Sequence, residues 1–274
     1  MVVPAVALTD VTVTFPAARR DVPPVTAVQG LSLTVPSGMF VTVIGPSGCG
    51  KSTLFGLLAG LITPISGSVT VHGQPVIGTP GQVGYMPQRD LLLPWRTVLQ
   101  NVTLGPELAR RGGMPAARAH ARERLPLFGL EGFADVYPSA LSGGMRQRAA
   151  LLRTVLMERD VLLLDEPFGA LDALTRAALQ EWLLGVWAAE GQTVLFITHD
   201  VDEAVFLADR VVVMTPRPGH VRTEIAVPLP RPRTHADLVA DPTFSALKAE
   251  VLAALGTTSP PGPSPLLVSN REGE

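Results

Sequence analysis

The spacing of apolar residues changes along the chain, and its first part alternates between apolar and polar positions. Between Val6 and Val43 this alternation is rich in β-branched residues, in the stretches VALTDVTVTF and LSLTVPSGMFVTVIG. It predicts half-buried β-strands on either side of an exposed loop, PAARRDVPP. A helix is predicted over 51–61, directly after a run of glycines, and a short strand in GSVTVHG.

Helical spacing prevails from Leu99 to about Leu156, where PAARAHARERLPLF carries alanine and arginine at a density that favours helix. Two fully apolar runs follow, VLLLD from Val161 and TVLFITHD from Thr193, and such runs are typical of buried parallel strands. A helix is predicted between them, over 175–190. Strand, helix and strand at this spacing form a βαβ unit, which predicts an α/β fold with a largely parallel, doubly wound sheet.

The C-terminal part predicts two more strands, able to form a hairpin, in DRVVVMTPRPGHVRTEIAVPL, and then a short helix over 244–255. The last residues, GTTSPPGPSPLLVSNREGE, are rich in proline, serine and glycine. That composition predicts a disordered tail.

Composition narrows the class of protein. An apolar fraction of 46% and a charged fraction of 17% are sufficient for a large core, and a net charge of −2 offers no basic surface field for nucleic acid. A single cysteine excludes an internal disulfide framework and a cysteine-cluster metal site. The N-terminus has no signal-peptide pattern, and the longest apolar run, LFGLLAGLI, is far shorter than the ~20 residues of a membrane-spanning helix. We therefore expect a soluble protein of the reducing cytoplasm.

The stretch GPSGCGKS fits the phosphate-loop pattern of Gly, four residues and Gly-Lys-Ser/Thr, and it lies between a predicted strand and a predicted helix. Glycines allow several N–H groups to point at an anion, and the start of the helix adds positive partial charge. Lys51, one of only two lysines in the chain, would neutralise phosphate, and Ser52 would offer its hydroxyl to Mg²⁺. The alternative, a glycine turn before an ordinary helix, explains less, and we interpret Cys49 as a small filler. The predicted ATP-binding residues here are Gly45, Pro46, Ser47, Gly48, Cys49, Gly50, Lys51, Ser52 and Thr53.

Two further stretches carry chemistry. In VLLLDEP a buried strand ends in Asp165, which can hold Mg²⁺, and Glu166, which can orient or deprotonate a water; the alternative is a pair of helix N-capping acids. In LSGGMRQR, Ser142, Gly143 and Gly144 lead into an amphipathic helix. This is a second helix start suited to an anion, and a single ATP in one monomer does not need both.

These motifs together resemble the ATPase subunit of ABC transporters. LSGGMRQR is similar to the family's signature motif, with Met145 where many members have glutamine. Gln88 in YMPQRD resembles the glutamine of the family's glutamine loop, GALD ending at Asp172 resembles the loop after the acidic pair, and His199 in ITHD resembles the switch histidine. Phe15 falls where the family has an adenine-stacking aromatic residue. Taken without the other motifs, His199 is an ordinary polar residue at a helix start and Phe15 an ordinary packing residue.

The resemblance implies the phosphate-loop NTPase fold of the ABC ATPase type: a mostly parallel core sheet, an antiparallel β subdomain and an inserted helical subdomain. It implies an ATPase domain over 4–230 with the helical subdomain at about 89–160, a C-terminal extension with a short helix over 231–257, and the tail over 258–274. It also implies a head-to-tail pair of ATPase subunits, in which Ser142, Gly143 and Gly144 contact the γ-phosphate of the partner's ATP, and it gives Asp172 as a further ATP-binding residue. Because the set of motifs in this chain is complete, we expect a pair of identical chains. Glu166 and His199 would be catalytic, and Ser52, Gln88 and Asp165 would hold or sense Mg²⁺.

Longer stretches resemble the importers of nitrate, sulfonates and taurine, with importers of thiamine-precursor pyrimidines as close relatives. They are LLLPWRTVLQNVTLGPEL, DEPFGALDALTR, THDVDEAVFLADRVVVMTPRPG and DPTFSALKAEVL. This resemblance implies integral-membrane permease subunits, an extracytoplasmic solute-binding protein, and a location at the cytoplasmic face of the membrane. The apolar stretch RDLLLPWRTV is open to two interpretations, packing inside the helical subdomain or a groove for a permease helix.

Two other function classes fit less well. An ABC-type ATPase acting on nucleic acid or ribosomes usually has two ATPase halves or a long insertion, whereas this chain has one set of motifs and a negative net charge. A phosphate-loop kinase or switch GTPase leaves LSGGMRQR without a role. A degenerate chain that binds ATP only to signal is disfavoured because Glu166 and His199 are both present.

Overall fold

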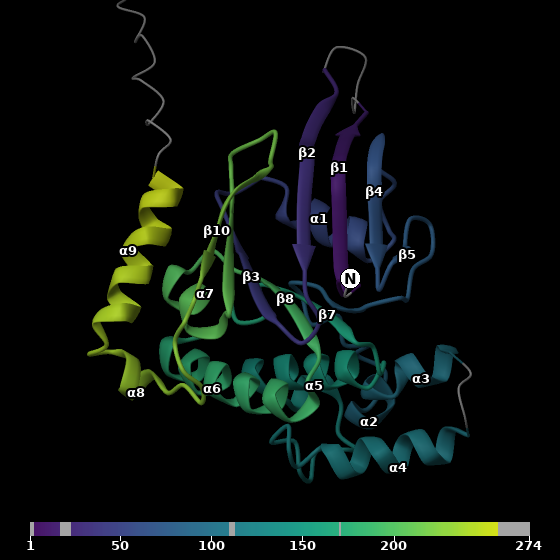
Figure 1. Cartoon of the computed structure of the whole chain (residues 1–274). Coiled ribbons are helices and arrows are strands. Elements are labelled where there is room, and N and C mark those ends of the chain that lie inside the picture. The colour runs from purple at the N-terminus through teal and green to yellow at the C-terminus, as the bar shows by residue number, and fades with distance from the viewer. Residues whose placement is uncertain (1–2, 17–22, 110–112, 170, 257–274) are drawn as a thin grey trace, which may run out of the picture.

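The centre of the molecule is a six-stranded sheet of order β10-β9-β3-β8-β7-β6, seen in the computed structural model, which describes residues 3–16, 23–109, 113–169 and 171–256 (Figure 1). Strands β9, β3, β8, β7 and β6 run parallel, and β10 pairs antiparallel with β9. The parallel strands therefore all end at one edge of the sheet. The strands are β3 (Phe40–Ile44), β6 (Gly84–Met86), β7 (Val161–Asp165), β8 (Thr193–Ile197), β9 (Arg210–Met214) and β10 (Val221–Ala226).

A second, four-stranded antiparallel sheet of order β2-β1-β4-β5 stands beside the first, with α1 between them (Figure 1). Leu54, Phe55, Leu57 and Leu58 of α1 are buried in one apolar cluster with residues of both sheets, which explains why this helix is apolar on almost every side. The elements are β1 (Val6–Phe15), β2 (Val25–Val35), α1 (Lys51–Leu58), β4 (Ser66–Val71) and β5 (Gln74–Pro75).

The two faces of the parallel sheet are both covered, and β7 shows how. Val161 and Leu163 belong to the cluster around α1, whereas Leu162 and Leu164 belong to a second cluster formed with helices on the opposite face. Successive side chains of a strand point to opposite faces, so a strand covered on both faces must be apolar throughout. This is why VLLLD does not alternate. The covering helices include α5 (Gly143–Val155), α6 (Ala173–Glu190), α7 (Val201–Leu207) and α9 (Pro242–Gly256).

The predicted helical region of 99–156 consists of several short helices rather than long ones. Thr97 caps the first of them in a capping box with Gln100, and α4 ends at Arg124, just before Leu125 and Pro126. Proline disfavours helix in the residue before it, which accounts for this end. The elements are α2 (Val98–Val102), α3 (Leu104–Ala109), α4 (Met114–Arg124), the 3-10 turn η1 (Pro138–Ala140) and α5.

The C-terminal part forms α8 (His235–Leu238) and α9, and it packs on α7 and on the β9–β10 hairpin. Arg233 is buried and donates hydrogen bonds to the Phe206 and Ala208 carbonyls at the end of α7, at 2.9 and 2.7 Å. The predicted hairpin and the helix over 244–255 are both present. The sequence pattern does not predict α7, α8, β5 or β6, all of which are short.

The predicted fold class is confirmed: the core sheet is mostly parallel, a separate sheet is antiparallel, and a group of helices is inserted between β6 and β7. The domain ranges 4–230, 89–160 and 231–257 remain predictions. The predicted tail over 258–274, and most of the predicted loop PAARRDVPP, lie outside the described residues.

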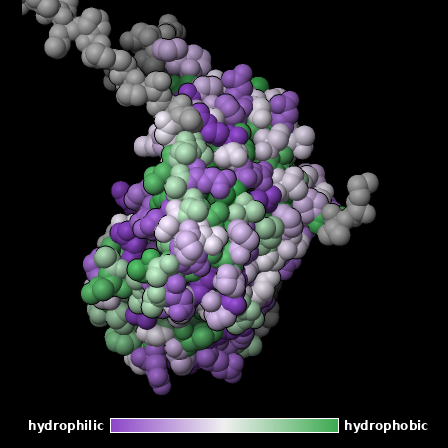
Figure 2. Space-filling view, turned by 60° about the vertical axis from the view of Figure 1, so that its left-hand side comes forward, coloured by the Kyte–Doolittle hydropathy of each residue, from purple (hydrophilic) through white to green (hydrophobic). Residues whose placement is uncertain are grey.

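The face that carries α9 shows small hydrophobic patches separated by hydrophilic residues (Figure 2). In the described part of the chain, no helix combines the length and the apolar character that crossing a membrane requires.

Candidate functional site

The loop between β3 and α1 has a backbone conformation that requires glycine at two positions. Gly50 has a φ of 103°, in the left-handed region, and a Cβ atom there would lie 2.6 Å from Val28 Cγ1. A Cβ atom on Gly45 would lie 2.9 Å from Cys49 Sγ. No side chain caps the start of α1, so its first N–H groups are available to a bound anion.

Lys51 lies folded over this loop. Its Nζ donates hydrogen bonds to the carbonyls of Gly45, at 2.8 Å, and Pro46, at 3.2 Å. The side chain is buried, so its positive charge is held at the mouth of the loop rather than in solvent. Cys49 is fully buried beneath it, which supports the interpretation of this residue as a small filler.

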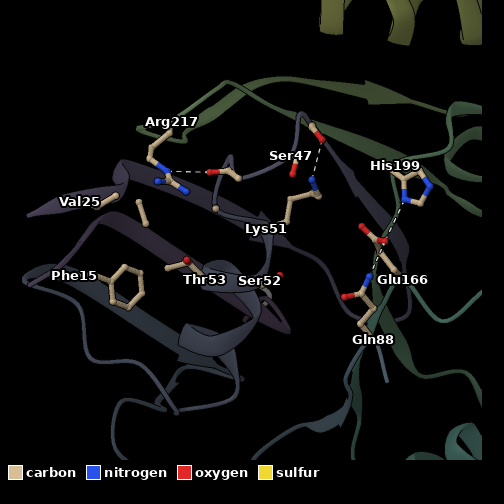
Figure 3. A pocket seen from close by; sticks show the side chains of 14 residues that line it. Phe15, Val25, Ser47, Lys51, Ser52, Thr53, Gln88, Glu166, His199 and Arg217 are labelled. Carbon is tan, nitrogen blue, oxygen red and sulfur yellow. Dashed lines mark hydrogen bonds and ion pairs between the residues drawn. The ribbon is translucent and has the colours of Figure 1, made fainter. Parts of the chain in front are cut away.

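The loop opens onto a cavity of about 640 Å³ (Figure 3). One part of the cavity is lined by the apolar side chains of Phe15, Val25 and Ala27, and Lys51 belongs to its polar part. Phe15 is 41% exposed, so it can offer an aromatic surface to a stacked base. The remaining residues that line the cavity are Gly45, Ser47, Gly48, Gly50, Ser52, Thr53, Gln88, Glu166, His199 and Arg217.

Glu166 is held between two other predicted site residues. Its Oε2 accepts a hydrogen bond from Gln88 Nε2, at 3.2 Å, and lies 3.1 Å from His199 Nδ1. Figure 3 shows the three side chains in a row, on the side of the cavity beyond Lys51. The Glu166 backbone is in the left-handed region, with a φ of 45°, and its N–H donates to the Ile197 carbonyl at 3.0 Å. A positive φ is uncommon outside glycine and marks a residue whose position the surroundings impose.

Asp165 ends β7 and is buried beside Glu166 and Lys51. Burial and the neighbouring Glu166 charge raise its pKa from 3.8 to about 6, although Lys51 and hydrogen bonds with the Ser52 and Tyr85 hydroxyls pull the pKa down. A buried carboxylate next to a hydroxyl and short of compensating charge suits a divalent cation with oxygen ligands. The residues present therefore fit Mg²⁺.

A buried polar network lies behind His199. Thr198 donates a hydrogen bond to Glu203, and Gln180 donates to the other oxygen of Glu203 at 2.8 Å. Gln180 Oε1 in turn lies 2.8 Å from Nε2 of His235, which is at the start of α8. Burial raises the pKa of Glu203. The C-terminal helices thus connect, through side chains, to the residue next to His199.

Seven predicted residues do not line this cavity. Pro46 and Cys49 belong to the phosphate loop and Asp165 is buried beside Lys51, whereas the other four belong to two other helix starts. Ser142 caps α5 by accepting a hydrogen bond from Met145 N at 3.3 Å, and Gly144 follows it on the first turn. Asp172 caps α6 by accepting from Thr175 N at 3.1 Å, a bond that lowers the Asp172 pKa. Gly143 lines a separate cavity of about 510 Å³ with Gln88 and Leu171. In a single chain Ser142 and Asp172 are local helix caps, and none of the four residues lines the cavity at the phosphate loop.

Three lining residues were not predicted: Val25, Ala27 and Arg217. The two apolar residues carry no signal, because valine and alanine are common on a strand whatever lies beside it. Arg217 follows a predicted buried strand, and in a parallel sheet the loops after the strands gather at one edge, so this position could have been identified.

We expect Asp165 to reduce the stability of the nucleotide-free, metal-free protein at neutral pH. The folded state favours the protonated carboxyl, since the pKa is about 6 in the folded protein against 3.8 as its ordinary value. Stability should therefore fall as pH rises from about 4 to about 6, by on the order of 2 kcal/mol. At pH 7.5, Asp165→Asn should melt a few degrees above the parent protein. At pH 4, the variant and the parent protein should have the same melting temperature.

The measurement is thermal unfolding in EDTA at both pH values, with Asp160→Asn, at an exposed aspartate before β7, as the control. The same shift at both pH values would show that Asp165 does not titrate in this range.

Comparison with known proteins places this site in a family. The model of the ABC transporter family matches residues 28–169. The aliphatic sulfonates import ATP-binding protein of Bacillus licheniformis is 43% identical over 230 residues, covering 84% of this chain and 87% of that protein. The nitrate import ATP-binding protein of Synechococcus elongatus is 43% identical over 241 residues, covering 87% of each. The formylaminopyrimidine import ATP-binding protein of Halalkalibacterium halodurans is 45% identical over 201 residues, covering 73% of this chain and 78% of its own.

Solved structures agree with the sequence comparison. A dimeric bacterial ABC transporter cassette has a TM-score of 0.71 at 30% identity, covering 81% of this chain and 98% of its own. The same similarity holds for a dimeric cassette in a post-hydrolysis state bound to ADP and phosphate. The predicted resemblance is confirmed, and the chain belongs to the ABC transporter family as an ATP-hydrolysing, ATP-binding subunit.

Proposed function

We propose that two copies of this chain form the ATP-driven motor of an importer for a small solute of the nitrate, sulfonate or taurine type, at the cytoplasmic face of the membrane. The observation that carries the proposal is the position of Glu166, which Gln88 and His199 hold beside the phosphate loop. Phosphate transfer to water needs little covalent chemistry from the protein, and it depends on positioning and charge stabilisation.

In this proposal each part of the cavity has a role toward ATP. Phe15 stacks the adenine, the loop of residues 45–53 binds the phosphates, and Lys51 neutralises the β- and γ-phosphates. Ser52, Asp165 and Gln88 hold Mg²⁺, which supplies further charge neutralisation when bound. Glu166 orients the attacking water in line with the γ-phosphate, and His199 contacts that phosphate and stabilises the charge that develops on it.

A homodimer would give a role to the start of α5, which does not line the cavity of its own chain. Gly143 and Gly144 begin α5 outside the chain's own cavity, although backbone N–H groups at a helix start favour an anion. In a head-to-tail pair, this start, with Ser142 and Asp172, closes over the ATP of the partner. Both solved cassettes named above are dimers at 30% identity. ATP then favours the closed pair, and hydrolysis favours the open one.

The permease contact is proposed for the surface beside Gln88. Leu91 is 57% exposed and Trp95 is 71% exposed, although Leu92 between them is buried. Leu91 and Leu92 line the cavity of about 510 Å³ that also reaches Gln88. Part of the stretch RDLLLPWRTV packs inside, and we propose that its exposed apolar part receives a helix of the permease. Gln88 belongs to both cavities, so it can report the state of the nucleotide to that helix.

The solute class rests on the relatives, which are named as import proteins for sulfonates, nitrate and formylaminopyrimidine. Importers of this kind imply an extracytoplasmic binding protein that delivers the solute. The net charge of −2 agrees with the absence of nucleic acid among the proposed partners.

Replacing Lys51 by alanine should remove most of the affinity for ATP, at least about 10-fold, because the only side-chain ammonium at the phosphate loop is lost. The measurement is the Kd for a fluorescent ATP analogue. Lys248→Ala is the matched control, since the other lysine of the chain lies on α9 in an ion pair with Asp202. Unchanged affinity in Lys51→Ala would contradict the assignment of the phosphate loop.

Replacing Glu166 by glutamine should lower kcat by about 100-fold or more, because an amide cannot accept the proton of the attacking water. ATP binding should persist, and ATP should still drive the variant into dimers, seen by size-exclusion chromatography with light scattering. Glu250→Gln, on the exposed side of α9, controls for the loss of one negative charge. Near-normal turnover would exclude Glu166 as the catalytic base, and a variant that binds ATP as a monomer would contradict the head-to-tail pair.

The partner is tested by tagging the chain, extracting it gently from native membranes and identifying co-purifying proteins by mass spectrometry. We expect to recover a permease with several membrane spans. Less permease should be recovered with Leu91→Asp than with the control Leu252→Asp, because Leu252 is comparably exposed but lies on α9. Recovery of ribosomal or DNA-bound proteins instead would favour an ABC-type ATPase acting on nucleic acid or ribosomes.

A further inference from the structure

Arg217 lies in the loop of residues 215–220 between β9 and β10, and no role toward the nucleotide has been assigned to it above. Strand β9 is the parallel neighbour of β3, so this loop and the phosphate loop follow adjacent strand ends. The loop is closed on itself, because Thr215 N donates to the His220 carbonyl at 3.0 Å and His220 N donates to Thr215 Oγ1 at 3.1 Å.

The loop is also fastened on both sides of the cavity. Gly219 N donates to the Ala27 carbonyl at 2.9 Å, and Gln29 N donates to the Gly219 carbonyl at 3.1 Å, which joins the loop to β2. A Cβ atom on Gly219 would lie 1.8 Å from the Cys49 carbonyl oxygen, so the backbones approach as closely as glycine allows. The position of Arg217 is therefore set relative to both the apolar wall and the phosphate loop.

The guanidinium of Arg217 is anchored at one nitrogen and open at the others. Nε donates a hydrogen bond to the Gly48 carbonyl at 3.1 Å, and the side chain lines the cavity. Within the described part of the chain, Nη1 and Nη2 make no hydrogen bond. In the view of Figure 3 the guanidinium lies between Phe15 and Val25 on one side and Lys51 on the other. Four N–H groups are thus available between the apolar and the phosphate-binding portions of the cavity.

The part of ATP that spans these two portions is the ribose and the α-phosphate. A guanidinium matches the oxygens of a phosphate group in charge and geometry, whereas a ribose hydroxyl offers no charge to neutralise. We propose that Arg217 binds the α-phosphate of the nucleotide and thereby acts as a positioning residue between the adenine and the reacting phosphate. This inference rests on the proposed assignment of the cavity to ATP.

The α-phosphate is common to ATP and ADP and does not change during hydrolysis, so the contact should contribute equally to both nucleotides. Arg217→Ala should weaken ATP and ADP by the same factor, about tenfold, as expected for one charge-assisted contact that solvent reaches. The loss in kcat/KM should lie in KM rather than kcat. Arg217→Lys should recover part of the affinity, because it restores the charge without the planar donors.

The experiment measures Kd for ATP and ADP by titration of the purified full chain, and the inhibition constant of inorganic pyrophosphate by displacement of a fluorescent ATP analogue. Pyrophosphate occupies the phosphate loop without an α-phosphate that bears ribose, so its binding should not change in Arg217→Ala. Arg222→Ala, on the neighbouring strand β10 and outside the cavity, is the control and should match the parent protein.

Three results would overturn the proposal. Unchanged affinity for both nucleotides would show that Arg217 makes no contact with them, and a loss confined to ATP would place the contact on the γ-phosphate. An equal loss for pyrophosphate would show that Arg217 only supports the loop through Gly48. The Lys51→Ala variant distinguishes these results from a failure of the proposed function. If Lys51→Ala binds nucleotide normally, the cavity is not the ATP site. If Lys51→Ala loses nucleotide binding, only the role of Arg217 is in question.

Discussion

The parallel pairing of four strands is the constraint on which the rest of this protein depends. Strands β9, β3, β8 and β7 lie side by side and run in one direction, so the loops that follow them emerge at one edge. Each of these loops carries a polar group of the site. Lys51 follows β3, Glu166 follows β7, His199 follows β8 and Arg217 follows β9. Hydrogen bonds between the strands therefore bring together side chains that lie far apart in the sequence.

Burial on both faces gives this edge its rigidity. The strands are covered by α1 and the antiparallel sheet on one side and by helices on the other, so they are held by apolar packing over their whole length. A rigid edge can hold conformations that a flexible loop would relax. Glu166 keeps a left-handed backbone, which costs about 1–3 kcal/mol, and Gly219 touches the phosphate loop at the limit of backbone contact. Of the described non-glycine residues with a positive φ, Glu166 is the one that lines the cavity.

One chain contains a cavity that Lys51, Glu166 and His199 line together, and a helix start that this cavity does not use. The first turn of α5 and the cap of α6 lie elsewhere in the chain, so their proposed role toward ATP requires a second copy. In the proposed head-to-tail pair, the reaction would therefore depend on whether the two copies are closed. Because Gln88 reaches from the carboxylate end of the cavity to the apolar surface around Leu91, a permease helix on that surface could sense the same event.

The order of residues along the chain was sufficient for the motifs that near neighbours form, although it missed the short elements α7, α8, β5 and β6. The phosphate loop, the acidic pair after a buried strand and the capped start of α5 are each formed by residues within about ten positions of one another, so pattern and residue type revealed them. Tertiary structure decided what distant segments do together. Only the folded chain shows that Gln88 and His199 share one oxygen of Glu166, that Val25 and Ala27 form a wall with Phe15, and that Arg217 is fastened above the phosphate loop. These contacts arise from strand order and from packing across the two sheets, and such long-range pairings leave no periodic trace in the sequence that forms them.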